Sequence, residues 1–281
     1  MMKQIFKQQV LSANKGKLKI KKPKKWLYPM AAERSYIKEL LKINEEFWKS
    51  VKINLIPVIP MLAADAQSTR GDSQKHDSSW IDQLKQIVEK TYFDFQKIIG
   101  EPTIKAITKE QAEKISLMNK IQFVKVIQSA VSINPITAEN WLEPQMKAFQ
   151  SQNTDLITKL SREQRDRVEN TLYTNLRAGK GVKEITKQLQ KDKEFGKNRS
   201  KLIARDQTNK FNGQLAQLRQ TELGIETYIW TTSRDERVRA SHRALDGKVI
   251  KWTDPPPEGH AGNPIRCRCI AQPIINDAMF E

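Results

Sequence analysis

Cysteine and histidine are rare in this chain, and most of them lie near its end. The 281 residues contain two cysteines and three histidines. Both cysteines fall in the stretch GHAGNPIRCRC, which also contains one of the histidines. Nitrogen and sulfur ligands of these types bind zinc in a closed tetrahedral site. A zinc site would stabilise a small module that has little core of its own. Its candidate ligands are His242, His260, Cys267 and Cys269.

The spacing of the two cysteines leaves a second interpretation open. In an extended strand, residues two apart share a face but are separated by about 7 Å. Cys267 and Cys269 could therefore bind one metal only if the chain bends between them. In the alternative, both cysteines pack as small residues at the edge of a strand, and His242 forms a local hydrogen bond. We expect no obligatory cofactor, with zinc as the alternative.

The same residues allow two enzymatic interpretations. A thiol nucleophile needs a histidine within hydrogen-bond distance and a carboxylate that orients it, a role open to Asp246 or Glu258. A metal-dependent nuclease would need converging carboxylates, such as Asp235 and Glu236, but their spacing matches no such motif. We therefore expect that the protein is not an enzyme. The alternative function is a metal-dependent nuclease or a thiol enzyme that uses the C-terminal His/Cys cluster.

A small α+β module is predicted around these side chains. IETYIWTTS alternates and is rich in β-branched and aromatic residues, which predicts a strand. RDERVRASHRAL predicts a short helix or turn, and Asp246-Gly247 a tight turn. A short strand is expected at residues 248–250, and CRCIAQPII is expected to form the final strand. Together these elements predict a short antiparallel sheet within residues 225–281.

The preceding part of the chain has helical periodicity. Apolar residues recur at steps of three and four from Ala31 onward, and Pro57 ends that pattern. Capping boxes at Thr108 and Ser161 predict new helix starts, and a long helix is expected to begin near Asn198. The fold class predicted is α+β, mostly α, with an elongated helical N-terminal region before the small C-terminal module. The predicted divisions are residues 1–30, 31–150, 151–224 and 225–281.

Positive charge is concentrated at the start of the chain. The formal net charge is +17 and the sequence pI is about 9.8, which favours acidic partners such as nucleic acid. Residues 1–32 contain nine lysines and no acidic residue. Residues 1–30 are thus predicted to be a mobile basic arm. Its candidate DNA-binding residues are Lys15, Lys17, Lys19, Lys21, Lys22, Lys24 and Lys25. No segment approaches the ~18 apolar residues of a membrane span, so no membrane partner is expected.

The C-terminal motifs resemble a known family. WTTSRDERVRASHRALDGKVIKW, a proline-glycine loop and NPIRCRC closely resemble the C-terminal signature of phage Mu F-like head-morphogenesis proteins. KLIARDQTNKFNG and LRAGKGVKEITKQL resemble the segments that precede this signature. The signature falls on Arg205, Trp230, Arg237, His242, Asp246, Gly247, Cys267, Arg268 and Cys269.

The resemblance implies a virion component rather than a metabolic enzyme. It implies a minor capsid protein that acts in head morphogenesis, is associated with the portal vertex, and takes part in DNA packaging or delivery. The implied partners are the portal protein, capsid or scaffold proteins, and DNA bound without sequence specificity. The implied location is the capsid interior or portal vertex of the virion, and the host cytoplasm during assembly.

Overall fold

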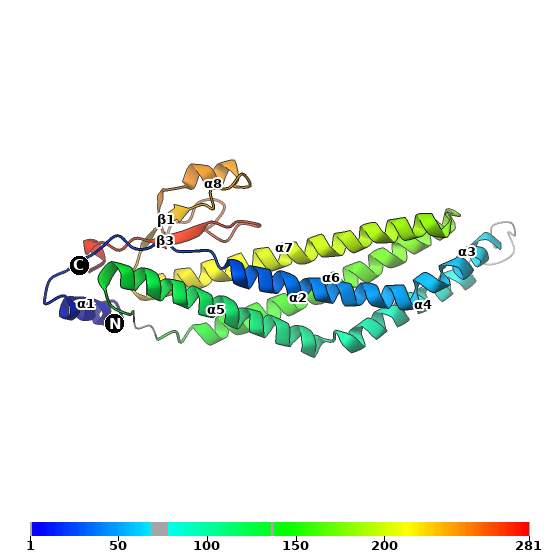
Figure 1. Ribbon diagram of the computed structural model, residues 1–281, viewed down its shortest axis with the longest axis horizontal. Coiled ribbons are helices and arrows are strands. Elements are labelled where there is room, and N and C mark those ends of the chain that lie inside the picture. Colours follow the sequence, from blue (N-terminus) through cyan, green and yellow to red (C-terminus); the bar gives the residue numbers. More distant parts are fainter. Residues whose placement is uncertain (1, 69–77, 136–137, 281) are drawn as a thin grey trace. The chain divides into compact units, whose positions relative to one another are not determined.

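A computed structural model describes residues 2–68, 78–135 and 138–280 of the chain (Figure 1). Long helices form most of the fold, and a small sheet follows them. The helices are α1 (Met2–Ala13), α2 (Met30–Asn54), α3 (Ile59–Ser68), α4 (Ser78–Ile98), α5 (Glu101–Val131), α6 (Leu142–Arg177), α7 (Val182–Glu222) and α8 (Ala240–Leu245). The strands are β1 (Thr227–Thr231), β2 (Val249–Lys251) and β3 (Ile270–Pro273).

The three strands form one antiparallel sheet in the order β2-β1-β3. Tyr228 of the central strand lies opposite Ile250 of β2 and Pro273 of β3, and Trp230 lies opposite Ala271. The side chains of Tyr228 and Trp230 alternate with half-buried neighbours and are themselves fully buried. The predicted fold class, mostly α with a small antiparallel sheet near the C-terminus, is confirmed.

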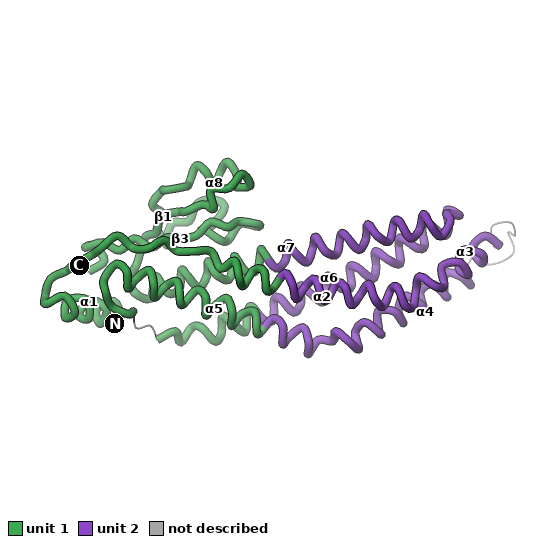
Figure 2. Tube along the Cα trace, viewed as in Figure 1, with its two compact units in different colours: residues 1–36, 109–149, 205–281 green, residues 37–108, 150–204 purple. Residues whose placement is uncertain are grey.

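The chain divides into two compact units, each built from separate stretches of sequence (Figure 2). Unit 1 contains residues 1–36, 109–149 and 205–281, and unit 2 contains residues 37–108 and 150–204. The boundaries predicted from the sequence at residues 30, 150 and 224 do not coincide with these units. Helical periodicity shows where an apolar stripe begins, but it does not show which distant stripe covers it.

The first thirty residues differ from the predicted mobile arm. Residues 2–13 form α1, and Phe6, Val10 and Trp26 are buried in a core of unit 1 that also contains Phe123 and Leu223. The backbone after α1 is held by hydrogen bonds to α5 and β3: Lys21 N–H to the carbonyl of Ala130, Lys24 N–H to Ser129 Oγ, and Trp26 N–H to Gln272 Oε1. The lysine content suggested a solvated tail, but the apolar residues between the lysines attach the segment to the core.

Several helix ends predicted from the sequence lie inside longer helices. Thr108 and Ser161 are buried within α5 and α6, where each hydroxyl donates to the carbonyl four residues earlier, at 3.1 Å in both cases. This interior hydrogen bond is the alternative to a cap for threonine and serine. The predicted start near Asn198 lies within α7. Gly196 also lies in the interior of α7. A side chain would not fit at this position, because an added Cβ would lie 2.2 Å from Asn44 Oδ1.

One helical stretch, Met30–Ser68, is long and apolar enough to cross a membrane by length and composition. The sequence expectation that no segment approaches this limit is therefore not met. The core helix of a soluble protein passes the same test, and part of the apolar window is buried within the protein.

Candidate metal centre

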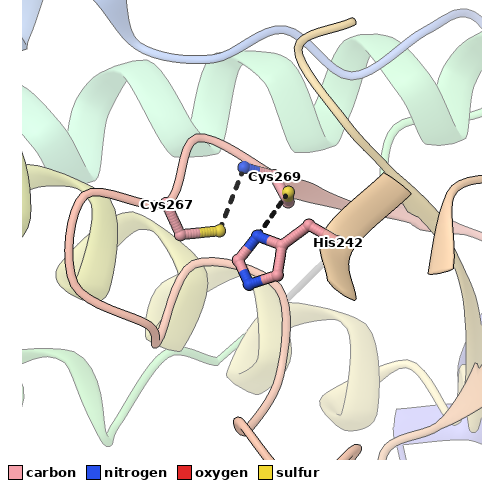
Figure 3. A group of neighbouring side chains, drawn as sticks. All are labelled: His242, Cys267 and Cys269. Carbon is pink, nitrogen blue, oxygen red and sulfur yellow. Dashed lines mark hydrogen bonds between the residues drawn. The ribbon is translucent and has the colours of Figure 1, made fainter. Parts of the chain in front are cut away.

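His242, Cys267 and Cys269 converge in unit 1 (Figure 3). Each offers one ligand atom, these atoms lie within 4.8 Å of one another, and all three residues are buried. Cys269 Sγ lies 3.5 Å from His242 Nδ1. His242 comes from α8, and the cysteines come from the loop before β3. The structure thus brings together three of the four residues predicted from the sequence.

The loop before β3 bends sharply at the two cysteines. The Cys267 N–H donates to the Pro264 carbonyl at 3.0 Å, and Arg266 within this turn has a φ of +59°. The Cys269 N–H then donates to Cys267 Sγ at 3.3 Å. Strand β3 begins only at Ile270, so the final strand is shorter than predicted. Because neither cysteine is part of the strand, the 7 Å spacing of an extended chain does not apply to them.

The two thiols are coupled to each other. A side-chain hydrogen bond from Cys269 is the main cause that lowers the pKa of the Cys267 thiol to about 6; burial opposes this shift, and the backbone N–H groups of Cys269 and Gly262 support it. The same hydrogen bond, together with burial, raises the pKa of Cys269. The hydrogen bond between the two thiols thus acts in opposite directions on their pKa values.

His242 has a second polar partner on its other ring nitrogen. Nε2 lies 3.0 Å from Glu258 Oε2, in the proline-rich loop after β2. Hydrogen bonds from Ser241 and then from His242 lower the pKa of the Glu258 carboxyl. A carboxylate at Nε2 favours the proton on that nitrogen and leaves Nδ1, the atom facing Cys269, free to accept. Of the two carboxylates considered from the sequence, Glu258 is the one in this position.

His260, the fourth predicted ligand, lies outside the cluster. Its Nδ1 is 3.1 Å from the Tyr228 hydroxyl, and its Nε2 is 3.1 Å from the Trp252 carbonyl oxygen. Burial lowers the pKa of His260. Both ring nitrogens are thus used within the small core of the sheet. The sequence shows that a histidine lies near the cysteines, but it does not show which atoms that histidine contacts.

The glycines of the proline-glycine loop let it approach α7 closely. Gly262 has a φ of +102°, and an added Cβ there would lie 3.2 Å from the Asn209 carbonyl oxygen. Asn209 Nδ2 donates to the Gly262 carbonyl at 2.9 Å. Across the contact, a Cβ on Gly213 would lie 2.9 Å from the Ala261 carbonyl oxygen. This contact fixes the loop that leads to the two cysteines.

Arg268, between the cysteines, points to a different partner. It lies 3.0 Å from Glu33 Oε1, and Arg205 lies 3.3 Å from the same oxygen. The Tyr28 hydroxyl donates to Glu33 Oε2 at 2.7 Å. Glu33 is 2% exposed. The two signature arginines therefore neutralise one buried carboxylate of α2, a partner that sequence reasoning missed because Glu33 lies far away in the chain.

The remaining signature residues shape the turn beside the cluster. Trp230 is buried, with its ring 5.3 Å from that of His242. Asp246 Oδ1 accepts the Thr232 N–H at 2.8 Å, and Gly247 has a φ of +82°. The Lys248 N–H donates to the Leu245 carbonyl at 2.9 Å and closes the turn between α8 and β2, as predicted for Asp-Gly. Arg237 is exposed and contacts only its neighbour Asp235 among the residues described.

The seven candidate DNA-binding lysines, residues 15–25, are all exposed. Among the residues that the structure describes, none of the seven forms an ion pair. Leu18 and Ile20 are half-buried between exposed neighbours, which is the pattern of an extended segment with one face against the protein. The lysines thus form an exposed row on a fixed segment; we call residues 15–25 the lysine row.

The His-Cys-Cys cluster has the chemistry of a site for a soft metal ion. Within the described ranges, it is the one group of three or more His, Cys, Asp or Glu residues whose ligand atoms lie this close. It contains no carboxylate, whereas Mg²⁺ prefers oxygen ligands. Its thiols are 4% and 3% exposed, whereas reactive thiols are typically accessible.

Comparison with known proteins finds a family match in the C-terminal part of the chain. Residues 166–272 match the family described as Phage Mu protein F like protein. This region contains β1, α8, β2, the His-Cys-Cys cluster and every signature residue, so the resemblance read from the sequence is confirmed over it.

Two particular relatives extend the comparison. The chain is 35% identical to an uncharacterized protein of Haemophilus influenzae over 136 residues, which are 47% of this chain and 30% of that protein. It is 26% identical to Minor head protein GP7 of Bacillus phage SPP1 over 132 residues, which are 46% of this chain and 39% of that protein. The matched region thus spans about a third of the length of these relatives. No solved structure matches the chain.

Proposed function

We propose that this protein is a minor head protein that acts in the morphogenesis of phage capsids. The match of residues 166–272 to the Mu protein F like family is the observation that carries the proposal. The similarity to a minor head protein of phage SPP1 supports it. The protein's proposed location is the virion, at the portal vertex or the capsid interior, after assembly in the host cytoplasm.

The proposed partners are the portal protein, with capsid or scaffold proteins beside it. A particle assay tests this step. The phage genome that encodes the chain is expressed with and without a stop codon in this gene, and procapsids are isolated by sedimentation. We expect the chain to sediment with procapsids and to be retained by tagged portal protein. Particles that lack the chain in the wild type, together with unchanged infectivity in the mutant, would contradict the proposal.

The lysine row supports a second part of the proposal, contact with packaged DNA. Its seven lysines are exposed, and their ammonium groups have no carboxylate partner among the described residues. A fixed row of cations neutralises phosphates without reading bases, so binding should be insensitive to sequence and steeply dependent on salt. If all seven lysines contact duplex DNA, the slope of log K against log salt is about −6.

Substitution by glutamine tests the lysine row. Replacing Lys15, Lys17, Lys19 and Lys21 should reduce the magnitude of this slope by about 3.6, that is, by about 0.9 for each lost phosphate contact. The matched control replaces four lysines that already pair with carboxylates: Lys42, Lys49, Lys97 and Lys105. Both variants carry the same net charge. Equal slopes for the two variants would refute a specific role of the lysine row.

A further inference from the structure

The distance between two of the three ligand atoms matches the geometry of a tetrahedral zinc site, and the third atom lies nearby. With Zn–S of about 2.3 Å and Zn–N of about 2.05 Å, tetrahedral angles place sulfur and nitrogen about 3.6 Å apart. The distance between Cys269 Sγ and His242 Nδ1 is 3.5 Å. Cys267 Sγ lies within 4.8 Å of both atoms. A zinc ion would thus bind between the three atoms with only small side-chain movements.

The groups around the three ligands also suit a metal. Ligating histidines usually donate their other ring N–H to a carboxylate or carbonyl, and Glu258 occupies that position at His242 Nε2. The N–H of Cys269 already donates to Cys267 Sγ, as amides do to metal-bound thiolates. The buried Nε1 of Trp230 has no hydrogen-bond partner among the described residues, and the Trp230 ring lies 5.3 Å from that of His242.

We propose that His242 Nδ1, Cys267 Sγ and Cys269 Sγ bind one zinc ion, with a water molecule as the fourth ligand. Two thiolates and an imidazole select a borderline-soft cation and disfavour Mg²⁺ and Ca²⁺. The ion joins α8 to the loop before β3, and so cross-links a small core that consists of little more than one side of a three-stranded sheet. The zinc proposal does not depend on the proposed function. A head protein could bind the portal with or without zinc, so either proposal can fail without the other.

Metal analysis of the full-length protein, purified without chelators, tests the proposal. We expect about one zinc per chain in the wild type, and at least a tenfold lower content in Cys269→Ser and in Cys267→Ser. The matched control is His260→Gln, which alters a buried histidine of the same core whose nitrogens contact only protein atoms. This control should keep its zinc. Loss of zinc from the control, or equal zinc contents in all four proteins, would overturn the assignment.

A second measurement covers the case in which the cysteine variants do not fold. Wild-type protein is stripped with a chelator and titrated with Co²⁺, which gives a thiolate-to-metal charge-transfer band and visible bands of tetrahedral geometry. We expect the bands to saturate at one equivalent, to disappear on addition of Zn²⁺, and to be unaffected by excess Mg²⁺. A stripped protein that keeps its circular dichroism and thermal midpoint, and gives no cobalt bands, would show that the cysteines only pack.

Discussion

The ion pairs of Glu33 allow the sharpest prediction about stability. Its carboxylate is 2% exposed and faces two guanidinium groups, of which Arg268 is 20% and Arg205 is 42% exposed at the side chain. Replacing Glu33 by glutamine keeps the shape and removes the charge. At 3.0 Å and an effective dielectric constant of about 20, the attraction to Arg268 alone is about 5.5 kcal/mol before the cost of desolvation.

Removing one partner of a buried ion pair typically lowers the free energy of unfolding by about 3–5 kcal/mol. Glutamine keeps an oxygen acceptor, and both arginines keep some contact with water, so we expect Glu33→Gln to lower the free energy of unfolding by about 2–3 kcal/mol. For a domain of about 150–250 residues this corresponds to a fall in thermal midpoint of about 4–12 °C. The matched control is Glu39→Gln, also on α2, which removes a more exposed pair with Lys42 and should cost less than about 1 kcal/mol.

Thermal unfolding followed by circular dichroism gives the midpoints, and a double-mutant cycle isolates the pair. Glu33→Gln and Arg268→Gln remove the same interaction, so the double variant should be less destabilised than the sum of the two single variants by about 1.5–3 kcal/mol. If the two changes were additive, or if Glu33→Gln cost no more than Glu39→Gln, the ion pair would not stabilise unit 1 and the reasoning would be refuted.

Three further predictions concern unit 1. Gly213→Val should destabilise it by about 1–3 kcal/mol in denaturant unfolding, since the new Cβ would lie 2.9 Å from the Ala261 carbonyl oxygen. The control Gly181→Val has open space around the new Cβ and should cost little. Burial raises the pKa of Glu139, but the hydrogen bond and charge of Arg219 outweigh it, and the net pKa is lowered from 4.5. This contribution is complete above pH 4.5 and is lost as pH falls through the folded-state value, so the stability difference between wild type and Glu139→Gln should shrink on acidification. Trp26→Ala should lower the free energy of unfolding by about 3–5 kcal/mol and remove hydrogen-exchange protection at the amides of Lys21 and Lys24. If these amides were unprotected in the wild type, the lysine row would not be fixed.

The C-terminal elements could be predicted from the sequence because their signals are local. The alternation of IETYIWTTS gives β1, and Asp246-Gly247 gives the turn, with a φ of +82° at the glycine. Both depend on residues within a few positions of each other. The cysteines were predicted less well, because the turn from Pro264 to Cys267 has its positive φ at Arg266, a residue type that does not indicate such a conformation.

The helical region shows why longer elements were predicted less reliably. A Ser or Thr followed three residues later by Gln satisfies a capping box, yet the same hydroxyl can donate to the carbonyl four residues earlier inside a helix. Thr108 and Ser161 both do so. Composition was also a poor guide to the packing of residues 1–30. The prediction there depended on nine lysines, although Phe6, Val10 and Trp26 decide the packing.

The Cys-Arg-Cys triplet links two separate networks of unit 1, and this explains its spacing. Cys267 and Cys269 turn toward His242 of α8, while Arg268 between them turns toward Glu33 of α2. In common zinc knuckles two residues separate the cysteines. With that spacing there would be no single central side chain that faces away from both sulfurs. The one-residue spacing is awkward for a metal in an extended chain, but the bend before β3 brings the two sulfurs together and leaves the arginine on the other side. The triplet thus connects the loop before β3 to both α8 and α2 at one point of the chain.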